Sequence, residues 1–288
     1  MNRDSLTRIA TIDANASEQQ REIARSTRGH NGGIITRLMS PGDLGEMLKP
    51  FVFLDLFDTG DQAIKGRNMH PHSGITTVTY VFEGSTRYED TTGASGILPA
   101  GGVEWFKAGR GAWHGGGAGE VGRTRGFQLW LALPPDVELG SVESINLTPR
   151  DVPDDGPAHL VVGSYGNTTS NLDPGSSLNY LAVTLRAGES WSYQPPAGHL
   201  IGWLSVAKGR LGNPGSTRAG DLVVFEPSET EIDITAETDT ELVIGSAVPA
   251  THDLALGTYS VHTSAESLAT GERQIVEIGQ RLRARGQL

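Results

Sequence analysis

Three of the eight histidines stand in the first half of the chain at spacings that suit metal binding. His70 and His72 are two residues apart, and on an extended strand such side chains point to the same face, about 6–7 Å apart along it. His114 follows on a later segment. Neutral imidazole is a good ligand for iron, zinc, copper and nickel. Three imidazoles from two strands of a small barrel could therefore hold one divalent transition metal and leave coordination positions open.

A His-x-His pair by itself is more often a surface or turn feature than a metal site. Here the residue between the two histidines is Pro71, which cannot donate a hydrogen bond to a neighbouring strand and so marks the edge or the start of a strand. Because a barrel opens to solvent at such an edge, Pro71 favours the metal-binding interpretation.

The elements expected to position these histidines are short β-strands. Apolar runs of strand length recur between Gly, Pro and Asp residues, a pattern that predicts an antiparallel sandwich or barrel. The runs cover residues 34–38, 51–57, 75–82, 126–133, 159–163, 178–185, 201–206, 222–226, 231–235 and 241–245. Helical periodicity appears only near the C-terminus, where residues 263–266 fit a capping box and Gly271 could divide the helix in two.

A segment rich in Pro and Asp, residues 148–157, separates two strand-rich halves of similar size. Both halves repeat a faint pattern, in which a turn ending in Gly follows one strand and a turn of small residues precedes the next. The predicted fold class is all-β, with two β-barrels in tandem and a short C-terminal helix. The first barrel is expected at residues 30–147, and the second barrel with the terminal helix at residues 158–288.

Composition excludes several kinds of site. The chain has no Cys, which removes disulfides, thiolate zinc sites, iron–sulfur clusters and Cys nucleophiles. Its formal net charge of -11 argues against nonspecific binding to nucleic acid or to an anionic membrane, because both need clusters of Lys and Arg. No apolar stretch is long enough to span a bilayer, and residues 1–30 contain no secretory signal. We therefore expect a soluble protein in the cytoplasm.

Other residues near the histidines have simpler structural explanations. Six aromatic side chains could line a pocket for a flat, apolar substrate, although most are expected in the barrel core. They are Phe53, Phe57, Tyr80, Trp105, Phe106 and Trp113. Asp55 and Asp58 are expected to cap a turn, and the Gly-rich segment 115–119 is expected to form a surface loop. His199 has no neighbouring histidine, which predicts a second barrel without metal.

The sequence around the three histidines resembles the pirin family, two-domain members of the cupin superfamily. The matching stretches are residues 70–84, which begin His-Pro-His-Ser-Gly, residues 96–102, and residues 105–114, which read Trp-Phe-Lys-Ala-Gly-Arg-Gly-Ala-Trp-His. Weaker similarity runs from about residue 34 to the helix near residues 259–270. The resemblance implies two stacked jelly-roll cupin barrels, a metal in the first barrel only, and in some members a quercetin-cleaving dioxygenase activity.

Carried over residue by residue, the family's metal-binding histidines correspond to His70, His72 and His114. The family's fourth ligand does not carry over. Pirins typically place a Glu two residues after the last histidine, where this chain has Gly116. Many also keep a Glu four residues after the second histidine, where this chain has Thr76.

Three interpretations of the fourth position remain open. The metal could be held by three histidines with water in the open positions, another carboxylate such as Glu120 could bind, or the site could have lost its metal. We favour the first interpretation, because the imidazoles would otherwise have no evident reason to converge. Glu120 is explained more simply as part of the Gly-rich segment.

The resemblance implies a metal-dependent dioxygenase that acts with O₂ on quercetin, a related flavonol or another enolizable aromatic compound. One divalent metal is expected, with Fe(II) as the first choice and other divalent metals left open. The alternative is a non-catalytic regulatory or protein-binding bicupin whose metal is structural or redox-sensing, and a metal-free ligand-binding barrel is the third interpretation. Loss of the Glu at positions 76 and 116 favours the non-catalytic alternative, whereas retention of all three histidines favours the enzyme. No catalytic base is assigned.

Overall fold

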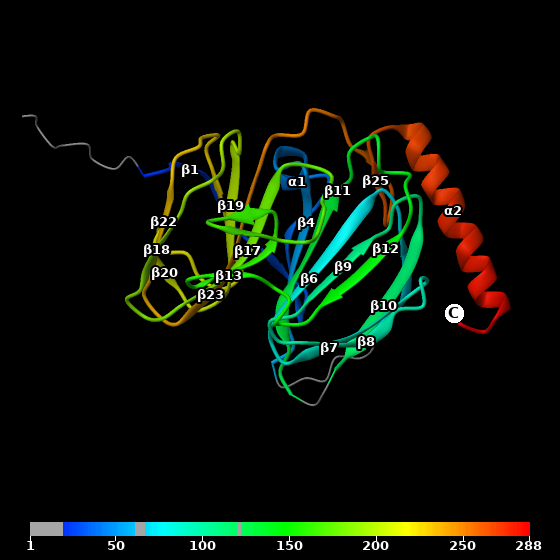
Figure 1. The fold of residues 1–288 in the computed structure, drawn as a ribbon, viewed down its shortest axis with the longest axis horizontal. Helices are drawn as coiled ribbons and strands as arrows, with labels where there is room; N and C mark the ends of the chain where they lie inside the picture. Colours follow the sequence, from blue (N-terminus) through cyan, green and yellow to red (C-terminus); the bar gives the residue numbers. More distant parts are fainter. Residues whose placement is uncertain (1–19, 61–66, 120–121) are drawn as a thin grey trace, which may run out of the picture.

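The computed structural model describes residues 20–60, 67–119 and 122–288. Its strands form two stacked barrels, each built from one large and one small antiparallel sheet (Figure 1). A single long helix follows near the C-terminus. The prediction of an all-β chain with two jelly-roll barrels in tandem and a C-terminal helix is confirmed.

The first barrel combines a seven-stranded sheet with a four-stranded sheet. Across the large sheet the order is β12 (Glu143–Leu147), β9 (Val103–Lys107), β6 (Ile75–Glu83), β11 (Arg125–Ala132), β4 (Phe51–Asp58), β3 (Ile35–Met39) and β2 (His30–Asn31). Across the small sheet the order is β5 (Arg67–His72), β10 (Ala112–Ala118), β7 (Ser85–Asp90) and β8 (Ser95–Pro99). A one-turn helix, α1 (Leu44–Met47), lies between β3 and β4.

The second barrel repeats this plan with a seven-stranded and a three-stranded sheet. The large sheet has the order β1 (Ile23–Arg28), β21 (Asp221–Phe225), β19 (Ile201–Lys208), β23 (Thr240–Ala247), β17 (Leu178–Leu185), β14 (Ala158–Val162) and β13 (Asp154–Asp155). The small sheet has the order β18 (Ser190–Tyr193), β22 (Ile232–Ala236) and β20 (Leu211–Asn213). Two short ribbons complete the strands: β15 (Ser164–Tyr165) with β16 (Thr168–Thr169), and β24 (Ala255–Leu256) with β25 (Val261–His262).

The two barrels share one apolar core between their large sheets. Strand β4 explains how, because seven of its eight residues are buried and it therefore packs on both faces. On one side Phe51 meets Trp203 of the second barrel with ring centroids 5.2 Å apart. The hydroxyl of Tyr80 lies 3.1 Å from Nδ1 of His159 across the same interface. The barrels are thus packed together over a continuous hydrophobic cluster.

Each end of the described chain packs on the barrel that is distant in sequence (Figure 1). Strand β1 pairs with β21 in the second barrel. Helix α2 (Ala265–Ala284) packs on β10 and β5 of the first barrel, and Nε1 of Trp113 donates to the carbonyl of Ile275 over 2.9 Å. The domain boundaries at 30–147 and 158–288 stay a prediction, but the helix expected with the second barrel lies against the first.

Helix α2 is one continuous helix with a different N-cap from the one predicted. Ser264 caps it by accepting from the backbone N–H of Ser267, whereas the hydroxyl of Thr263 donates to Glu138. Gly271 does not divide the helix, which runs unbroken from Ala265 to Ala284. The glycine is buried where the helix crosses Ser73 and His262, and a Cβ atom there would meet both side chains. Neither helix of the described residues has the length and apolar character needed to cross a membrane.

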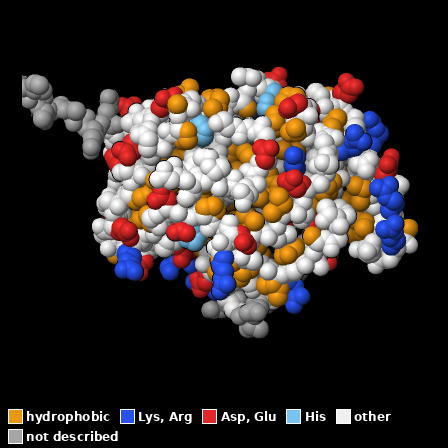
Figure 2. Space-filling model, in the orientation of Figure 1, with side chains coloured by type: hydrophobic (Ala, Val, Ile, Leu, Met, Phe, Trp, Pro, Cys, Tyr) orange, Lys and Arg blue, Asp and Glu red, His pale blue; other side chains and the backbone are white. Residues whose placement is uncertain are grey.

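The basic tail of the chain lies on this helix. Arg281 and Arg283 are in its last turn and exposed, where cations interact favourably with the helix dipole. Figure 2 shows Lys and Arg side chains gathered at the end of the molecule where α2 lies. These arginines thus lie on the solvent-exposed side of the helix.

Candidate metal centre

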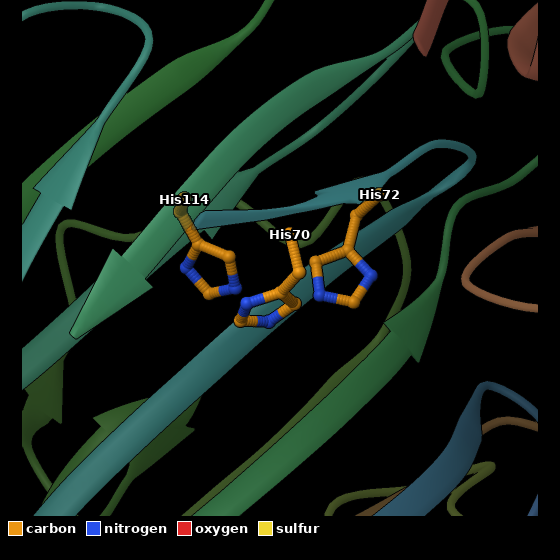
Figure 3. A group of neighbouring side chains, drawn as sticks. All are labelled: His70, His72 and His114. Atoms are coloured by element: carbon orange, nitrogen blue, oxygen red, sulfur yellow. The ribbon is translucent and has the colours of Figure 1, made fainter. Parts of the chain in front are cut away.

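Strands β5 and β10 bring three histidines together in the first barrel (Figure 3). His70 and His72 leave the same face of β5, and His114 lies directly opposite His70 in the antiparallel register. Ring centroids are 4.6 Å apart for His70 and His114, and 5.0 Å apart for His72 and His114. One nitrogen from each ring lies within 4.8 Å of the others. Strand β5 is the edge of its sheet, as Pro71 indicated.

The hydrogen bonds of His72 fix which of its nitrogens can bind a metal. Its Nδ1 lies 2.9 Å from the carbonyl oxygen of Tyr259. Because a carbonyl oxygen only accepts, Nδ1 must carry the proton, and in the neutral ring the lone pair is then on Nε2. In Figure 3 this second nitrogen faces the other two rings.

His114 is held just as firmly. Its ring is 3% exposed in the side chain and stacks on Phe106, with centroids 4.6 Å apart and planes at 3°. Nδ1 lies 3.6 Å from Oε1 of Glu104, and in Figure 3 the other nitrogen faces His70. That nitrogen is Nε2, and both nitrogens of His114 are buried without a hydrogen-bond partner among the described residues. A buried imidazole nitrogen aimed at two other imidazoles fits a metal ligand, so the residues present suit the ion that the resemblance implies.

Neither expected position supplies a carboxylate to this site. Gly116 lies in β10 opposite Tyr88, and a Cβ atom placed on it would come within 2.5 Å of the carbonyl oxygen of Arg87. Thr76 is fully buried on β6, and strand alternation puts it on the opposite face from Thr79, which lines the site. Glu120 lies outside the described residues.

The Gly-rich segment differs from the surface loop that was predicted. Residues 115–117 continue strand β10 and pair with β7. They also line the cavity beside the histidines. Their small size leaves the strand surface open next to His114, so the loop prediction is wrong for these residues.

A cavity of about 150 Å³ opens beside His70 and His114. Its apolar wall consists of Ile34, Ile35 and Phe57. Of the six aromatic residues singled out in the sequence, Phe57 lines this cavity and the other five do not; Phe53, for example, stacks on Trp130. Most of the six are core residues, as expected.

A row of polar side chains forms the floor of the cavity. They lie opposite one another on five neighbouring strands, and we call them the polar row: Glu104, Thr79, Gln128, Asp55 and Arg37. Oγ1 of Thr79 donates to Oε2 of Glu104 over 2.9 Å. Arg37 forms an ion pair with Asp55 at the other end. The first four members of the row line the cavity. Ile35 and Phe57 lie two residues along β3 and β4 from Arg37 and Asp55, so the apolar and polar side chains lie next to one another on the same face of the large sheet.

Two members of the polar row correct or extend the sequence analysis. Asp55 does not cap a turn, because it lies inside β4 with its side chain buried against Arg37. Asp58, at the end of β4, does accept from the backbone N–H of Gly60 over 3.1 Å. Glu104 was missed altogether, although a single carboxylate between the apolar residues Val103 and Trp105 is a signal that could have identified it.

Strand β25 and the residues beside it contact the end of β5, the strand that carries His70 and His72. We call residues 259–263 the clamp segment. Ser73 donates to the hydroxyl of Ser260 over 2.8 Å and lies 3.0 Å from Nε2 of His262. Nδ1 of His262 lies 3.1 Å from Glu138. Burial lowers the pKa of His262, and the neighbouring Glu138 opposes this shift.

These groups have the order of a Ser–His–carboxylate triad, but they cannot act as one here. Ser73, His262 and Glu138 are 0%, 1% and 2% exposed, and helix α2 covers them at Gly271. A nucleophile must reach its substrate. The network therefore fixes the clamp segment, which in turn holds His72 through Tyr259.

In the second barrel His199 has hydroxyl partners on both ring nitrogens. Nε2 lies 3.0 Å from Oγ of Ser177, and Nδ1 lies 2.8 Å from Oγ of Ser246. Burial lowers the pKa of this imidazole. His199 is thus a hydrogen-bonded structural residue.

Known proteins resemble this chain over much of its length. The family described as Pirin matches residues 34–131. A "Pirin-like protein" of Caulobacter vibrioides is 31% identical over 230 residues, which cover 75% of this chain and 81% of that protein. A Pseudomonas aeruginosa protein named "Putative quercetin 2,3-dioxygenase PA3240" is 42% identical over 122 residues, which cover 41% of this chain and 42% of that protein.

Solved structures show the same fold. A quercetin 2,3-dioxygenase from Acinetobacter baumannii superposes with a TM-score of 0.80 at 21% identity, over 92% of this chain and 98% of that one. The bacterial pirin YhhW from Escherichia coli, solved in complex with nickel(II), gives a TM-score of 0.62 at 20% identity, over 80% and 98% of the two chains. At these identities the likeness concerns the fold alone.

Proposed function

The chain belongs to the pirin family, and on that premise we propose that it is a metal-dependent dioxygenase acting on a flavonol or another enolizable aromatic compound. The observation that carries the proposal is the convergence of His70, His72 and His114, one nitrogen from each ring within 4.8 Å of the others, beside a cavity with an apolar wall and a polar floor. Sequence relatives named putative quercetin 2,3-dioxygenases support the reaction class.

The proposed metal is a single divalent ion held by the three histidines. Fe(II) is our first choice, and the nickel(II) complex of the relative YhhW supports a site of this kind that accepts other divalent ions. When bound, such an ion supplies Lewis-acid polarisation and redox capability next to the cavity.

The chain itself would bind and orient the substrate. Ile34, Ile35 and Phe57 offer a flat apolar surface to an aromatic ring and exclude water from that side. The polar row next to this surface offers acceptors to the hydroxyl groups that a flavonol carries on its rings. The cavity therefore suits a ligand that is apolar on its faces and polar at its edges.

Oxygen consumption tests this proposal. Untagged protein is freed of metal, reconstituted anaerobically with Fe(II), and mixed with a panel of flavonols and related enols in an oxygen-electrode cell. We expect turnover in wild type, none in His114→Ala, and wild-type turnover in His30→Ala, because His30 is an exposed residue of β2 away from the cavity lining.

A protein that binds metal but consumes no oxygen with any of these substrates would contradict the enzyme proposal. The non-catalytic bicupin, with a structural or redox-sensing metal and a protein partner, would then be the better account. The lack of a Glu at positions 76 and 116 is the observation that favours this second candidate.

A further inference from the structure

A buried acidic side chain lies on the floor of the cavity in the first barrel. Glu104 is 9% exposed and lies on β9 between Val103 and Trp105, both fully buried. Among the described residues no Lys or Arg lies within ion-pair distance of its carboxylate; the basic group that does is His114. Since a buried carboxylate costs several kcal/mol unless it is compensated, its retention here calls for a specific role.

The contacts of Glu104 divide its two oxygens between two tasks. Oε2 accepts from the hydroxyl of Thr79 over 2.9 Å, which fixes the carboxylate on the cavity floor. Oε1 lies 3.6 Å from Nδ1 of His114. This distance is longer than a hydrogen bond, and Nδ1 of His114 is buried with no hydrogen-bond partner among the described residues. Because a carboxylate oxygen is an acceptor, Glu104 is placed to favour the tautomer of His114 with its proton on Nδ1 and its lone pair on Nε2. Nε2 is the nitrogen that faces the cluster in Figure 3.

We propose that Glu104 is a positioning residue for the metal centre: it faces Nδ1 of His114, where it can accept from that nitrogen once an ion is bound, and it keeps a carboxylate at the site in place of the one missing at Gly116. The inference rests on the proposed metal centre. The carbonyl of Tyr259 takes the equivalent place beside His72, so two of the three ligands have an acceptor behind them. Such partners orient a ligating imidazole and raise its basicity.

The geometry assigns Glu104 to this outer role and not to direct ligation. The nitrogens that converge within 4.8 Å come from the three histidines, and Glu104 contacts the opposite nitrogen of His114. A direct ligand at Gly116 would also need β7 to move, because a Cβ there meets the carbonyl of Arg87. With Glu104 behind His114, the chain keeps a carboxylate at the centre and leaves the position of a fourth protein ligand open to substrate.

Metal affinity tests the inference independently of turnover. Metal-free wild type, Glu104→Gln and Glu104→Leu are titrated with Co(II) against a chromophoric chelator. We expect affinity to fall by about 10- to 100-fold in Glu104→Leu. A smaller loss is expected in Glu104→Gln, which keeps an oxygen that can accept from Nδ1. The melting temperature of the metal-free variants should stay level or rise, because a buried charge has been removed, whereas a merely structural residue would lower it.

Glu143→Gln is the matched control. Glu143 lies on the neighbouring strand β12, accepts from Nε1 of Trp105 over 2.9 Å, and loses the same charge without touching a histidine. Its affinity for Co(II) should equal that of wild type. The visible spectrum of bound Co(II), which reports the ligand set, should be retained in Glu104→Gln.

Unchanged affinity in Glu104→Leu would overturn the positioning role. A change of coordination number in the spectrum of Glu104→Gln would overturn it as well, by showing direct ligation. If wild type itself binds no Co(II), Ni(II) or Fe(II), the proposed metal centre fails before the inference is reached, so the two failures are distinguishable.

Discussion

At the scale of residues, two of the three imidazoles have an acceptor beside the nitrogen that faces away from the cluster. Nδ1 of His72 lies 2.9 Å from the carbonyl oxygen of Tyr259, and Nδ1 of His114 lies 3.6 Å from the carboxylate of Glu104. The hydrogen bond of His72 selects one tautomer and one ring orientation, and stacking on Phe106 orients the ring of His114. We therefore expect a metal to bind to these side chains with little rearrangement.

Metal binding should therefore stabilise the folded chain, and the histidines should be needed for it. At a free metal concentration of about 100 times Kd, a single site adds about 2.7 kcal/mol to the free energy of unfolding. We expect Fe(II) or Ni(II) to raise the melting temperature of wild type. The melting temperatures of His72→Ala and His114→Ala should not change when either ion is added.

Without metal, both variants should still unfold cooperatively, because two apolar cores stabilise the chain and each buried Val, Leu, Ile or Phe contributes about 1.5–3 kcal/mol. Differential scanning fluorimetry with and without metal, beside circular dichroism of the metal-free proteins, checks both expectations. A variant that is already unfolded in the absence of metal would show that the replaced histidine is needed for folding.

A second prediction at this scale concerns His199. Burial lowers its pKa below the ordinary value, so between the two values the unfolded chain binds a proton that the folded chain does not. Stability is therefore lost as the pH falls through the ordinary pKa of about 6.5 toward the lowered one. Replacing His199 by Gln, which can still bond a serine, should reduce the loss in unfolding free energy between about pH 7 and about pH 5.5. His252 and His262 shift in the same direction and should leave a residual slope.

Urea unfolding of metal-free wild type and His199→Gln across this pH range measures the difference. Metal-free protein is needed because protonation of the ligating histidines would otherwise add its own pH dependence. Equal slopes for the two proteins would show that His199 titrates alike in the folded and unfolded chains.

The sequence predicted that three histidines converge, as the structure shows, and it did not identify the residues beside them. The pair His70 and His72 can be recognised from the sequence, because the alternation of side chains along a strand is a local rule. Glu104 and Asp55 enter the site only through the register of β9, β6, β11 and β4, which is set by long-range pairing. For Asp55, the local rule of turn capping gave the wrong role.

At the scale of elements, each of the ten predicted apolar runs coincides with a strand to within two residues at each end. Strands β7, β8 and β10 are less apolar, because they form the small sheet and expose one side to the cavity or to solvent. The run of glycines in β10 is typical of a loop, but these residues belong to a strand because they pair with β7. Polar or Gly-rich strands of a small sheet thus lack the local signal on which sequence reasoning depends.

Helix α2 offers a prediction of opposite sign from helix propensity. Replacing a helical Gly by Ala stabilises an exposed helix by about 1 kcal/mol. At Gly271 the added Cβ would come within 2.6 Å of Nε2 of His262, inside the buried network that fixes the clamp segment. Overpacking costs about 1–3 kcal/mol, so Gly271→Ala should destabilise the chain on balance.

Gln280→Ala is the control, because it also improves helix propensity and lies at an exposed position of the same helix. Its stability should stay within about 0.5 kcal/mol of wild type. Denaturant unfolding measures both variants, and a Gly271→Ala protein as stable as Gln280→Ala would contradict the close packing of α2 on the clamp segment.

At the scale of the whole molecule, the two barrels are joined by charge as well as by apolar surface. Arg125 of the first barrel is 1% exposed in its side chain and contacts Glu241 of the second barrel at 2.8 Å and Glu83 at 2.7 Å. Removing one partner of a buried ion pair costs about 3–5 kcal/mol. Because Glu241 keeps 15% exposure, we expect Arg125→Ala to lie at or below the lower end of this range.

Wild type should unfold in one transition, since the barrels share a core, and calorimetry can compare it with Arg125→Ala. Lys208→Ala is a useful control, because Lys208 also faces Glu241 but at 3.8 Å and with 52% of its side chain exposed. Two separate transitions in wild type would show that the barrels are independent.

The positions of the two chain ends could not be predicted from the sequence, because they depend on long-range contacts. The faint internal repeat predicted two barrels, but the pairing of β1 with the second barrel and the packing of α2 on the first depend on surfaces that exist only after both barrels have formed. The clamp segment, which comes from the second half of the chain, contacts His72 at the end of β5 and the adjacent Ser73 in the first barrel.

The central claim is that His70, His72 and His114 hold one metal ion. Elemental analysis of untagged protein, loaded with Fe(II) or Ni(II) and then freed of loosely bound metal, tests it most directly. The account predicts a single ion per chain in wild type and in His30→Ala, and none in His72→Ala or His114→Ala. Metal-free wild type after loading, or His114→Ala with as much metal as wild type, would contradict it.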